Sequence, residues 1–252
     1  MKVCYFTATG NCLYVAERIG GELLSIPQLI KQNKVEIMDD AVGVVCPVYA
    51  GEMPMMVREF LSKARICTDY FFFIYTYGSG YGEAYAHAEL AAVTAGLKLS
   101  YINAVIMVDN YLPAFEMREQ MDTLPQKDVE GQLKKICQDI SERKERTVTI
   151  TPENKTRMDF YRKRLAIPIL RKDAAQSYIV NDDCNKCGVC VKVCPANNIM
   201  VTDKVTFFDH CEVCYACLRN CPQNAIHMET EKSAVRFRNG HVSLQDIIRA
   251  NG

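Results

Sequence analysis

Several features that would identify common classes of protein are absent from this sequence. It has no net formal charge at neutral pH and no aromatic–basic platform, which argues against binding to nucleic acid. No apolar run is long enough to cross a bilayer, and no strongly amphipathic face indicates attachment to a membrane surface. The N-terminus does not resemble a signal peptide, because its first apolar residues run into a polar loop by Thr7. We therefore expect a cytoplasmic protein.

The four histidines do not suggest a catalytic centre. They are scattered along the chain, and no Cys/His or Ser/His/Asp arrangement stands out around them. Their positions are His87, His210, His227 and His241. We therefore assign no catalytic residue.

Cysteine, in contrast, is abundant, with 13 in 252 residues. Eight of them form two copies of one pattern near the C-terminus, in which three cysteines separated by two residues precede a fourth that is followed by proline. The first copy is Cys184, Cys187, Cys190 and Cys194-Pro195, and the second is Cys211, Cys214, Cys217 and Cys221-Pro222. The other cysteines have no ligand spacing, and we expect them to pack as small hydrophobes. They are Cys4, Cys12, Cys46, Cys67 and Cys137.

The duplicated pattern predicts two cubane iron–sulfur clusters. Three closely spaced cysteines wrap one cluster, and the fourth cysteine, beyond the loop, ligates the cluster of the other copy. The expected ligands are Cys184, Cys187, Cys190 and Cys221 for one [4Fe–4S] cluster, and Cys211, Cys214, Cys217 and Cys194 for the second. Structural zinc has a longer gap between its cysteine pairs, and a disulfide framework belongs to small secreted domains. Residues 178–228 resemble the bacterial two-cluster ferredoxins. Abundant cysteine without a signal for secretion implies a reducing cytosol, and exposed clusters favour an organism that avoids oxygen.

The length and the pattern of the first 150 residues indicate a second, larger domain. Predicted strands alternate there with predicted helices. We expect strands over 2–6, 42–48, 70–76 and 101–108, helices over 13–24, 55–64, 83–96 and 129–146, and a short edge strand within 23–30, which Pro27 disfavours. Such alternation predicts an α/β fold with a doubly wound parallel sheet, whose ligands bind at the carboxyl ends of the strands.

Three loops at those strand ends have the composition of a ligand site. The first, residues 7–12, precedes a helix and combines hydroxyls with a glycine, as a phosphate site does, but it lacks the lysine of nucleotide-triphosphate loops. The second, residues 47–54, places Tyr49 beside Ala50 and Gly51, which suits a stacked flat ring. The third, residues 76–82, has three glycines that let backbone amides approach a ligand. The alternatives are an ordinary helix N-cap and surface tyrosines.

Taken together, these loops resemble those of the flavodoxins, over about residues 1–148. The family's phosphate loop is Ser/Thr-x-Thr-Gly-Asn-Ser/Thr; residues 7–11 match it, and Cys12 replaces a hydroxyl by a weak thiol donor. The resemblance implies FMN, with its phosphate held by Thr7, Thr9, Gly10, Asn11 and Cys12. It implies contacts around the flavin ring, with Tyr49 stacked on it, from Pro47, Tyr49, Ala50, Gly51, Thr76, Tyr77, Gly78, Gly80, Tyr81, Gly82 and Asn110, with Tyr111 beside them.

The whole chain resembles a family of flavodoxin–ferredoxin fusion proteins of anaerobic bacteria and archaea. The expected organisation is a flavodoxin-like FMN domain at 1–148, a basic helical joining segment at 149–177, a small α+β two-[4Fe–4S] ferredoxin domain at 178–230 and a C-terminal extension at 231–252. The basic residues of the joining segment are Lys155, Arg157, Arg162, Lys163, Arg164, Arg171 and Lys172. We interpret them either as a solvated helix packed across the two domains or as a docking surface for an acidic redox partner.

The resemblance implies an electron-transfer protein that relays electrons between FMN and two [4Fe–4S] clusters, to or from an unidentified redox partner protein. Flavin handles electrons in pairs or singly, whereas a cubane cluster handles one, so the combination joins the two kinds of chemistry. Two alternatives stay open. In the first, the chain is a flavin-dependent reductase of a small organic substrate. In the second, it is a ferredoxin whose flavodoxin-like half binds no flavin and serves as an interaction module.

Overall fold

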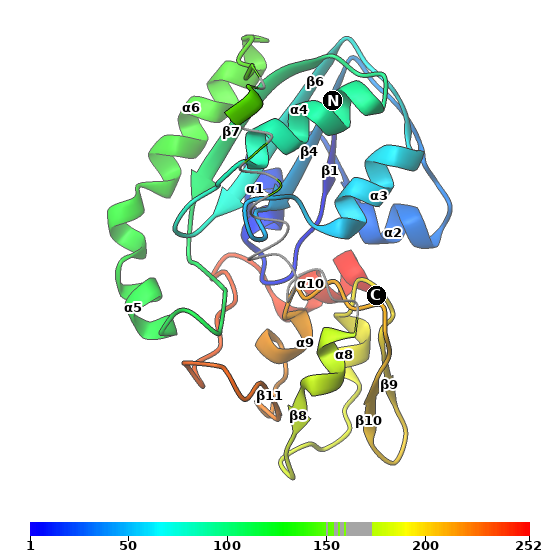
Figure 1. Cartoon of the computed structure of the whole chain (residues 1–252), viewed down its shortest axis with the longest axis vertical. Helices are drawn as coiled ribbons and strands as arrows, with labels where there is room; N and C mark the ends of the chain where they lie inside the picture. Colours follow the sequence, from blue (N-terminus) through cyan, green and yellow to red (C-terminus); the bar gives the residue numbers. More distant parts are fainter. Residues whose placement is uncertain (150, 154–155, 157–158, 160–172) are drawn as a thin grey trace.

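The computed structural model consists of a parallel β-sheet with its helices and a smaller cysteine-bearing part at one end of that sheet (Figure 1). It describes residues 1–149, 151–153, 156, 159 and 173–252. The seven basic side chains of the predicted joining segment lie outside the described residues, so both interpretations of that segment stay predictions. Among the described residues, no helix combines the length and the apolar character needed to span a membrane.

The sheet has five parallel strands in the order β2-β1-β4-β6-β7. Their bounds are Lys2–Tyr5 for β1, Glu22–Ser25 for β2, Ala41–Pro47 for β4, Tyr70–Tyr77 for β6 and Leu99–Ile106 for β7. Counted along the chain, this is the order 2-1-3-4-5 of flavodoxin-like folds, in which the winding reverses between the first and third strands. The predicted fold class is therefore confirmed.

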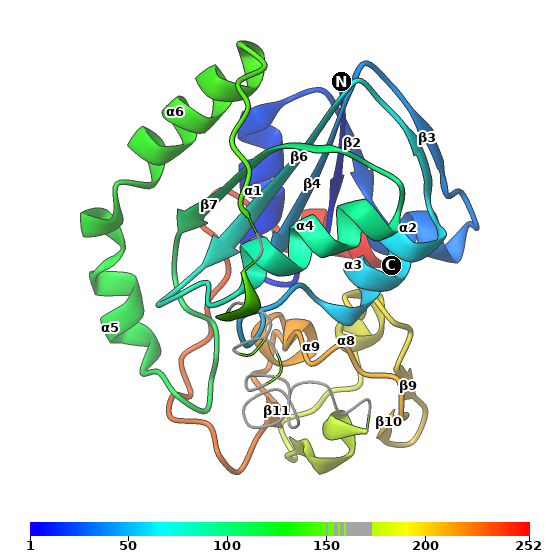
Figure 2. The same cartoon turned by 45° about the horizontal axis from the view of Figure 1, so that its top comes forward.

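Helices cover both faces of the sheet (Figures 1 and 2). One face carries α1 (Asn11–Ile19) and α6 (Val129–Ser141), and the other carries α2 (Ile26–Lys31), α3 (Met55–Lys63) and α4 (Ala84–Thr94). In β6, Phe72 belongs to the core beneath α1, whereas Phe71 and Phe73 belong to the core on the opposite face. Continuous apolar runs such as this one are what strands buried on both faces require.

Helix α1 is shorter than the sequence analysis predicts. It ends at Ile19 rather than near residue 24, because Gly20 and Gly21 adopt left-handed φ values of 83° and 88° and lead the chain into β2. Pro27 does not interrupt this strand. It lies in the first turn of α2, where a backbone N–H would have no acceptor within the helix, so the absence of one in proline costs no hydrogen bond. Ser25 caps that helix.

A few short elements have no counterpart among the predictions. They are the paired strands β3 (Glu36–Met38) and β5 (Arg65–Cys67), the helix α5 (Met117–Asp122) and the 3₁₀ turn η1 (Leu124–Lys127). Each spans six residues or fewer, which is too short for hydrophobic periodicity to be recognised in the sequence.

The cysteine-bearing part, residues 173–252, contains only short elements before its last helix. They are η2 (Ala174–Ser177), β8 (Ile179–Val180), α8 (Val189–Lys192), β9 (Ile199–Val201), β10 (Val205–Phe207), α9 (Ala216–Arg219) and β11 (Ile226–His227). β8 pairs with β11 and β9 with β10, both antiparallel. The internal repeat of the sequence is visible here, because α8 carries Cys190 and α9 carries Cys217, the third cysteine of each copy.

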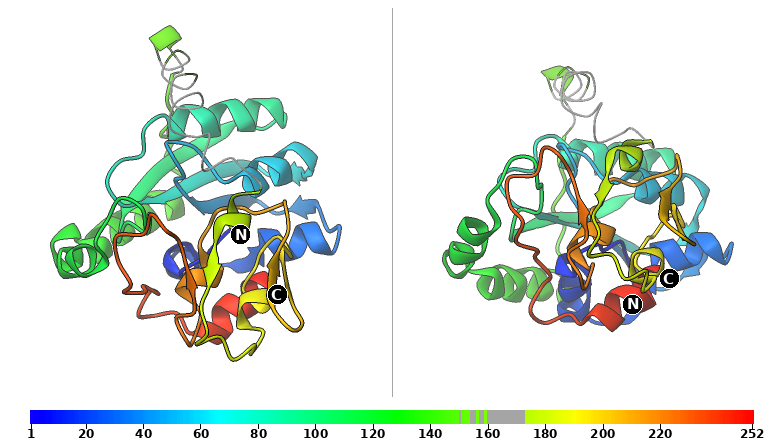
Figure 3. Two further views of the ribbon diagram at one scale, coloured as in Figure 1. Left: turned by 60° about the horizontal axis from the view of Figure 1, so that its bottom comes forward. Right: turned by 90° about the horizontal axis from the view of Figure 1, so that it is seen from below.

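The C-terminal segment returns to the sheet. Helix α10 (Leu244–Asn251) begins with a capping box in which Ser243 and Asp246 accept each other's backbone N–H groups. It contacts α2 of the sheet-bearing part, which is residues 1–149, and α8 of the cysteine-bearing part (Figure 3). Ile247 and Ala250 are buried in the same core as residues of β1 and α1. One core therefore continues from the sheet through α10 to the cysteine-bearing part.

Candidate functional site

A cavity of about 290 Å³ lies at the carboxyl ends of β1, β4, β6 and β7. It is next to the switch point between β1 and β4, where open α/β sheets bind their ligands. Residues of all three predicted loops line it: Thr7, Ala8, Thr9, Asn11, Cys12, Pro47, Val48, Tyr49, Ala50, Gly51, Thr76, Tyr77, Gly78, Ser79 and Gly80. Beyond β7, the wall is formed by Val108, Asp109, Asn110, Tyr111 and Phe115. The structure thus gathers most of the predicted flavin-site residues around one cavity.

The loop between β1 and α1 has the geometry of an anion site. Gly10 is the N-cap of α1 with a left-handed φ of 96°, and its N–H donates to Thr7 Oγ1 at 3.2 Å. Thr9 Oγ1 accepts a hydrogen bond from Asn110 Nδ2 at 2.9 Å. The first N–H groups of a helix have no acceptor within the helix, and the helix dipole favours negative charge at this end. A phosphate at this end of the cavity would satisfy them.

Cys12 occupies the position where the resemblance places a hydroxyl. Its Sγ lies 3.1 Å from Thr76 Oγ1, and the side chain is 2% exposed. Burial raises the pKa of the Cys12 thiol to about 12, so the group is neutral at physiological pH. A neutral thiol adds no charge that would repel a phosphate, although it is a weaker donor than a hydroxyl.

Tyr49 stands on the cavity wall at a sharp turn. Its ring packs edge-to-face on Phe6, with the ring centroids 6.4 Å apart. Ala50 and Gly51 follow with left-handed φ values of 49° and 80°, and the backbones of Tyr49 and Glu52 exchange hydrogen bonds of 2.7 and 3.0 Å across the turn. The turn holds the backbone of Tyr49 at the cavity, as a ring that stacks on a flat ligand requires.

The third loop contributes less of its length than predicted. Tyr77 lines the cavity, but Gly10 of the first loop and Tyr81 and Gly82 of the third are not among the lining residues. Tyr81 packs edge-to-face on Tyr77 and stacks on Tyr85 of α4, with centroids 5.4 and 4.7 Å apart. A Cβ at Gly82 would lie 2.9 Å from the Cα of Gly51, so the second and third loops touch there.

Asn110 presents an unsatisfied acceptor at the cavity. Its Nδ2 is bonded to Thr9, and its backbone oxygen accepts a 2.7 Å hydrogen bond from Arg219 Nη2. Its side-chain Oδ1 is buried and has no hydrogen-bond partner in the described part of the chain. A buried polar atom without a partner costs free energy, so a ligand that carries an N–H or O–H group fits this wall.

Three residues of the cysteine-bearing part, Val213, Cys214 and Tyr215, form another wall of the cavity. Val213 and Tyr215 have left-handed φ values of 49° and 59°, which are strained for a β-branched and for an aromatic residue. The rings of Tyr215 and Tyr111 lie 6.3 Å apart. The sequence analysis missed this wall because nothing in the cysteine pattern tells which surface faces the sheet. The only signal was an aromatic residue between two of the cysteines.

Four cysteines surround a second, smaller cavity directly beneath this wall. They are Cys194, Cys211, Cys214 and Cys217, which we call the inner cysteine set. Two backbone N–H groups donate to their sulfurs, Asn198 to Cys194 Sγ and Val213 to Cys211 Sγ, both at 3.2 Å. Burial raises the pKa of the Cys211 thiol to about 11, so a bound cluster would have to supply the positive charge that holds it as a thiolate.

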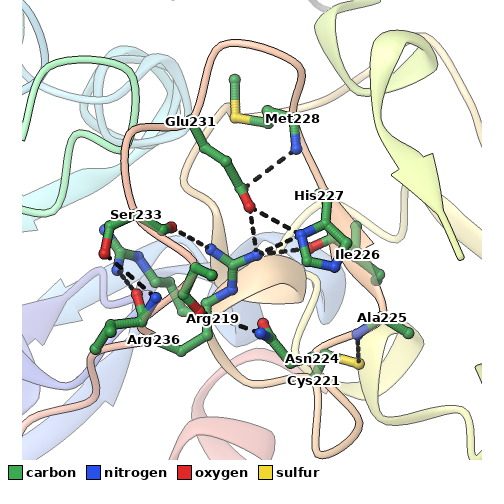
Figure 4. A network of polar contacts seen from close by, with 12 residues as sticks. Arg219, Cys221, Asn224, Ala225, Ile226, His227, Met228, Glu231, Ser233 and Arg236 are labelled. Carbon is green, nitrogen blue, oxygen red and sulfur yellow. Dashed lines mark hydrogen bonds and ion pairs between the residues drawn. The ribbon is translucent and has the colours of Figure 1, made fainter. Parts of the chain in front are cut away.

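The other four cysteines of the duplicated pattern surround a third cavity. They are Cys184, Cys187, Cys190 and Cys221, which we call the outer cysteine set. Ala225 N–H donates to Cys221 Sγ at 3.3 Å (Figure 4). Cys187 is exposed, whereas Cys194 and Cys217 of the inner set are buried. In both sets the fourth cysteine comes from the opposite copy of the pattern, which is the exchange that the sequence analysis predicts.

A polar network holds the chain that follows Cys221 (Figure 4). Arg236 Nη2 donates to Glu231 Oε1 at 3.0 Å and to Ile226 O at 3.1 Å, and His227 Nδ1 lies 2.8 Å from the same Glu231 oxygen. Burial tends to raise the pKa of Glu231, but the hydrogen bonds from Arg236 and His227 outweigh it and lower this pKa. The carboxylate is therefore charged and anchors the loop beside the outer set.

Arg219 connects this network to the large cavity. It is 3% exposed, and it donates to Asn110 O at 2.7 Å and to Val235 O at 3.4 Å. Burial, with a smaller contribution from Arg236, lowers the pKa of Arg219 to about 10, so it stays protonated at physiological pH. Arg219 thus places a buried positive charge between Cys217 of the inner set and Cys221 of the outer set in the sequence. Its hydrogen bond to Asn110 also brings this charge to the wall of the large cavity.

In the ranges that the structure describes, no three thiol, imidazole or carboxylate groups converge as they would around a single metal ion. The cysteines of each set instead line a shared cavity, and a cubane cluster binds each thiolate through a different iron. The donor set, four thiols each, is the one that [4Fe–4S] clusters use.

Comparisons with known proteins bear on part of this assignment. A family described as "4Fe-4S binding domain" matches residues 177–200, which contain the first copy of the cysteine pattern. The chain therefore carries a binding region for at least one 4Fe-4S cluster. No curated protein matches the chain. A crystal structure described as a "putative flavoprotein", from Bacteroides eggerthii DSM 20697, aligns with 49% of this chain and 96% of its own, with 16% sequence identity and a TM-score of 0.30. That similarity is too low to bear on function.

Proposed function

We propose that this chain is an intracellular electron-transfer protein that binds FMN in the large cavity and a [4Fe–4S] cluster at each cysteine set. It exchanges electrons with a redox partner protein. A flavin takes up or releases electrons in pairs or singly and a cubane cluster handles one, so the chain joins two-electron and one-electron chemistry. The protein supplies position, hydrogen bonds and a dry environment.

The observation that carries the proposal is the position of Cys214. This residue lines both the large cavity and the cavity of the inner cysteine set. Cys214 would then contact both a ligand in the first cavity and a cluster in the second. Such an arrangement favours electron exchange within one chain over two independent modules on a tether.

FMN fits the large cavity better than FAD does. The cavity has one anion site, at the N-terminus of α1, and two tyrosines, Tyr49 and Tyr77, on its walls. Its volume of about 290 Å³ lies just below the usual range for ligand pockets, about 300–1,000 Å³, which favours a mononucleotide over a dinucleotide.

The exposure of the cysteines suggests the order of transfer. The inner set shares a wall with the flavin cavity, and the outer set includes the exposed Cys187. Electrons would therefore pass between the flavin and the inner cluster, and between the outer cluster and the partner protein.

Anaerobic purification followed by analysis of iron, sulfide and flavin tests the proposal. We expect about eight irons and eight sulfides per chain by cluster stoichiometry, together with one FMN. Zinc in place of iron, or about half that iron, would contradict the two-cluster assignment. Clusters without stoichiometric FMN, even after reconstitution, would favour the flavin-free interaction module.

Rapid mixing tests whether the transfer is intramolecular. After partial reduction of the clusters by dithionite, their reoxidation should coincide with bleaching of the flavin absorbance. The rate should not depend on protein concentration, because both sites belong to one chain. A rate proportional to concentration would mean transfer between molecules and would contradict the relay.

A further inference from the structure

Two buried asparagines of the cysteine-bearing part donate hydrogen bonds to the phosphate loop, which we define as residues 7–12. Asn251 Nδ2 donates to Thr7 O at 3.0 Å, and Asn220 Nδ2 donates to Ala8 O at 3.1 Å. Their exposed fractions are 0% and 3%. Neither residue lines the large cavity, so both approach the loop from its other side.

A third asparagine, Asn239, completes this arrangement. Its backbone N–H donates to Thr9 O at 2.8 Å, and its Nδ2 donates to Asn11 Oδ1 at 3.1 Å. The neighbouring Val242 fills the space beside Gly10, where an added Cβ would lie 2.8 Å from Val242 Cβ. Gly10 must therefore be glycine for two reasons: its φ is left-handed, and a side chain at this position would clash with Val242 of the C-terminal segment.

These contacts set the orientation of the loop's peptide groups. The carbonyls of three consecutive residues, Thr7, Ala8 and Thr9, are bonded to residues that do not line the cavity. In a planar trans peptide the C=O of one residue and the N–H of the next point in opposite directions. Turning the carbonyls of Thr7 and Ala8 away from the cavity therefore directs the N–H groups of Ala8 and Thr9 to the opposite side, where an anion would accept from them. The N–H of Gly10, which follows the third carbonyl, instead donates to Thr7 Oγ1 within the loop.

We propose that Asn220, Asn239 and Asn251 are positioning residues for phosphate recognition, so that FMN affinity depends on the docked cysteine-bearing part. This inference rests on the proposed binding of FMN. The asparagines line neither the large cavity nor the two cysteine cavities. Asn220 and Asn251 act through the backbone of the phosphate loop, and Asn239 acts through the backbone of Thr9 and the side chain of Asn11. We name them the asparagine clamp.

The clamp also links the flavin site to both cysteine sets. Asn220 directly precedes Cys221 of the outer set and bonds to Ala216 O at 2.9 Å. Asn251 also bonds to Val193 O at 3.2 Å, next to Cys194 of the inner set. Because linkage is reciprocal, FMN binding should favour cluster retention to the same extent that intact clusters favour FMN binding.

Matched substitutions test the clamp in anaerobic holoprotein from which the flavin has been removed. Asn239→Asp and Asn251→Asp keep the side-chain size but replace the donor by a charged acceptor facing an oxygen. Asn224→Asp is the control, because Asn224 Nδ2 also donates to a backbone carbonyl, Ala234 O at 3.1 Å, away from the phosphate loop. Titrations with FMN and with riboflavin, which lacks the phosphate, measure affinity, and iron analysis measures the clusters.

We expect the two clamp variants to lose about tenfold or more in FMN affinity, while riboflavin affinity and iron content stay as in the wild type. The control should bind both flavins like the wild type. Unchanged FMN affinity in the clamp variants would overturn the proposal. Equal losses for FMN and riboflavin would also overturn it, because the asparagines would then only hold the two parts together. A wild-type protein that binds no FMN would instead refute the proposed function and remove the basis of the clamp.

A second measurement needs no variant and decides the matter if the substitutions prevent folding. The wild-type protein is exposed to an iron chelator without oxygen, with FMN, with riboflavin or with no flavin. Reciprocal linkage predicts that FMN leaves more iron in the protein at equilibrium with the chelator than riboflavin does. Equal iron content in all three conditions would contradict the coupling.

Discussion

The sheet-bearing part, residues 1–149, and the cysteine-bearing part, residues 173–252, are held together in different ways. β4 and β6 pair over seven residues, and their apolar side chains are buried on both faces of the sheet. Before α10, the strands of the cysteine-bearing part have two or three residues and its helices α8 and α9 have four. Elements this short bury too little apolar surface to be stable by themselves.

The difference shows where each part obtains its stability. The sheet-bearing part can rely on hydrophobic burial, which is the dominant favourable contribution in a domain of this size. The cysteine-bearing part must take much of its order from the core that it shares with the sheet and, under the proposed function, from bound clusters, because metal binding contributes directly to folding. Five predictions test this contrast, in order of decreasing expected effect.

Removal of both clusters should unfold the cysteine-bearing part and leave the sheet folded. Hydrogen exchange after anaerobic chelation would show this, since amides of β1, β4 and β6 should keep their protection while those of β9, β10 and α9 lose it. Loss of protection in both parts at the same rate would mean that the sheet depends on the clusters as well.

Cys214→Ala and Cys187→Ala should separate the roles of the two cysteine sets. Each variant should lose about half of the iron, because each removes one ligand of one cluster. Only Cys214→Ala should also abolish electron exchange with the flavin, because Cys214 forms the shared wall. Iron analysis and rapid mixing would measure the two effects. Fast flavin reduction in Cys214→Ala, or its loss in Cys187→Ala, would contradict the proposed order of transfer.

Gly10→Val should destabilise the protein by about 3 kcal/mol or more, and FMN affinity should fall with it. The substituted residue would have an unfavourable φ of 96° and would clash with Val242. Gly96→Val is the control, since Gly96 also has a left-handed φ, 73°, but no atom within 4 Å of an added Cβ. Its cost should be about 1–2 kcal/mol. Chemical unfolding measures both, and equal costs would show that the C-terminal segment does not press on the loop.

Arg219→Met should reduce stability by about 2 kcal/mol, because it leaves the carbonyls of Asn110 and Val235 without their buried donor. The unfolding transitions of the two parts should also move apart, since this residue joins them. Arg65→Met, at an exposed ion pair with Glu36, should change stability by less than about 0.5 kcal/mol. Thermal unfolding followed by calorimetry distinguishes the two variants.

Asp139→Asn should have the smallest effect, confined to the sheet-bearing part. The hydrogen bond from Lys144 lowers the pKa of Asp139, and the Tyr101 hydroxyl at 3.0 Å adds to this effect against burial. Folding therefore favours the charged form of Asp139. Its contribution to the free energy of unfolding is fully present above the usual aspartate pKa of about 3.9, and it is lost as the pH falls through the lowered pKa of the folded state. The free energy of unfolding of the wild type should exceed that of the variant by a constant amount of about 1 kcal/mol between pH 8 and pH 5, and by less in stronger acid. Denaturant titrations across this range would measure it; a difference that grows toward low pH would contradict the assignment.

Much of this architecture is predictable from the sequence because local signals specify it. The apolar run of β6 and the alternation of strands and helices predict the sheet, and the spacing of the cysteines predicts which thiols share a cavity. Each of these signals depends on a few neighbouring residues. Helix α1 was predicted too long because Leu23 and Leu24 continue its periodicity beyond the two glycines that end it.

The rest depends on how the two parts dock, which no local pattern encodes. Cys214 and Tyr215 belong to the cavity wall only because the cysteine-bearing part lies against the carboxyl ends of the strands. The asparagine clamp is a set of single asparagines in three different segments, and an isolated asparagine is common in any loop. Only the tertiary arrangement shows that the three converge on one loop.

The clamp has a consequence for synthesis of the protein. Thr7 and Asn251 are separated by 244 positions, so the phosphate loop leaves the ribosome long before its last hydrogen-bond donor exists. A nascent chain can build its sheet early, because domains fold as they emerge. We expect it to bind FMN weakly until the C-terminal segment has been translated and docked. Tight flavin binding would then occur only after translation has passed Asn251 and the clusters have been inserted.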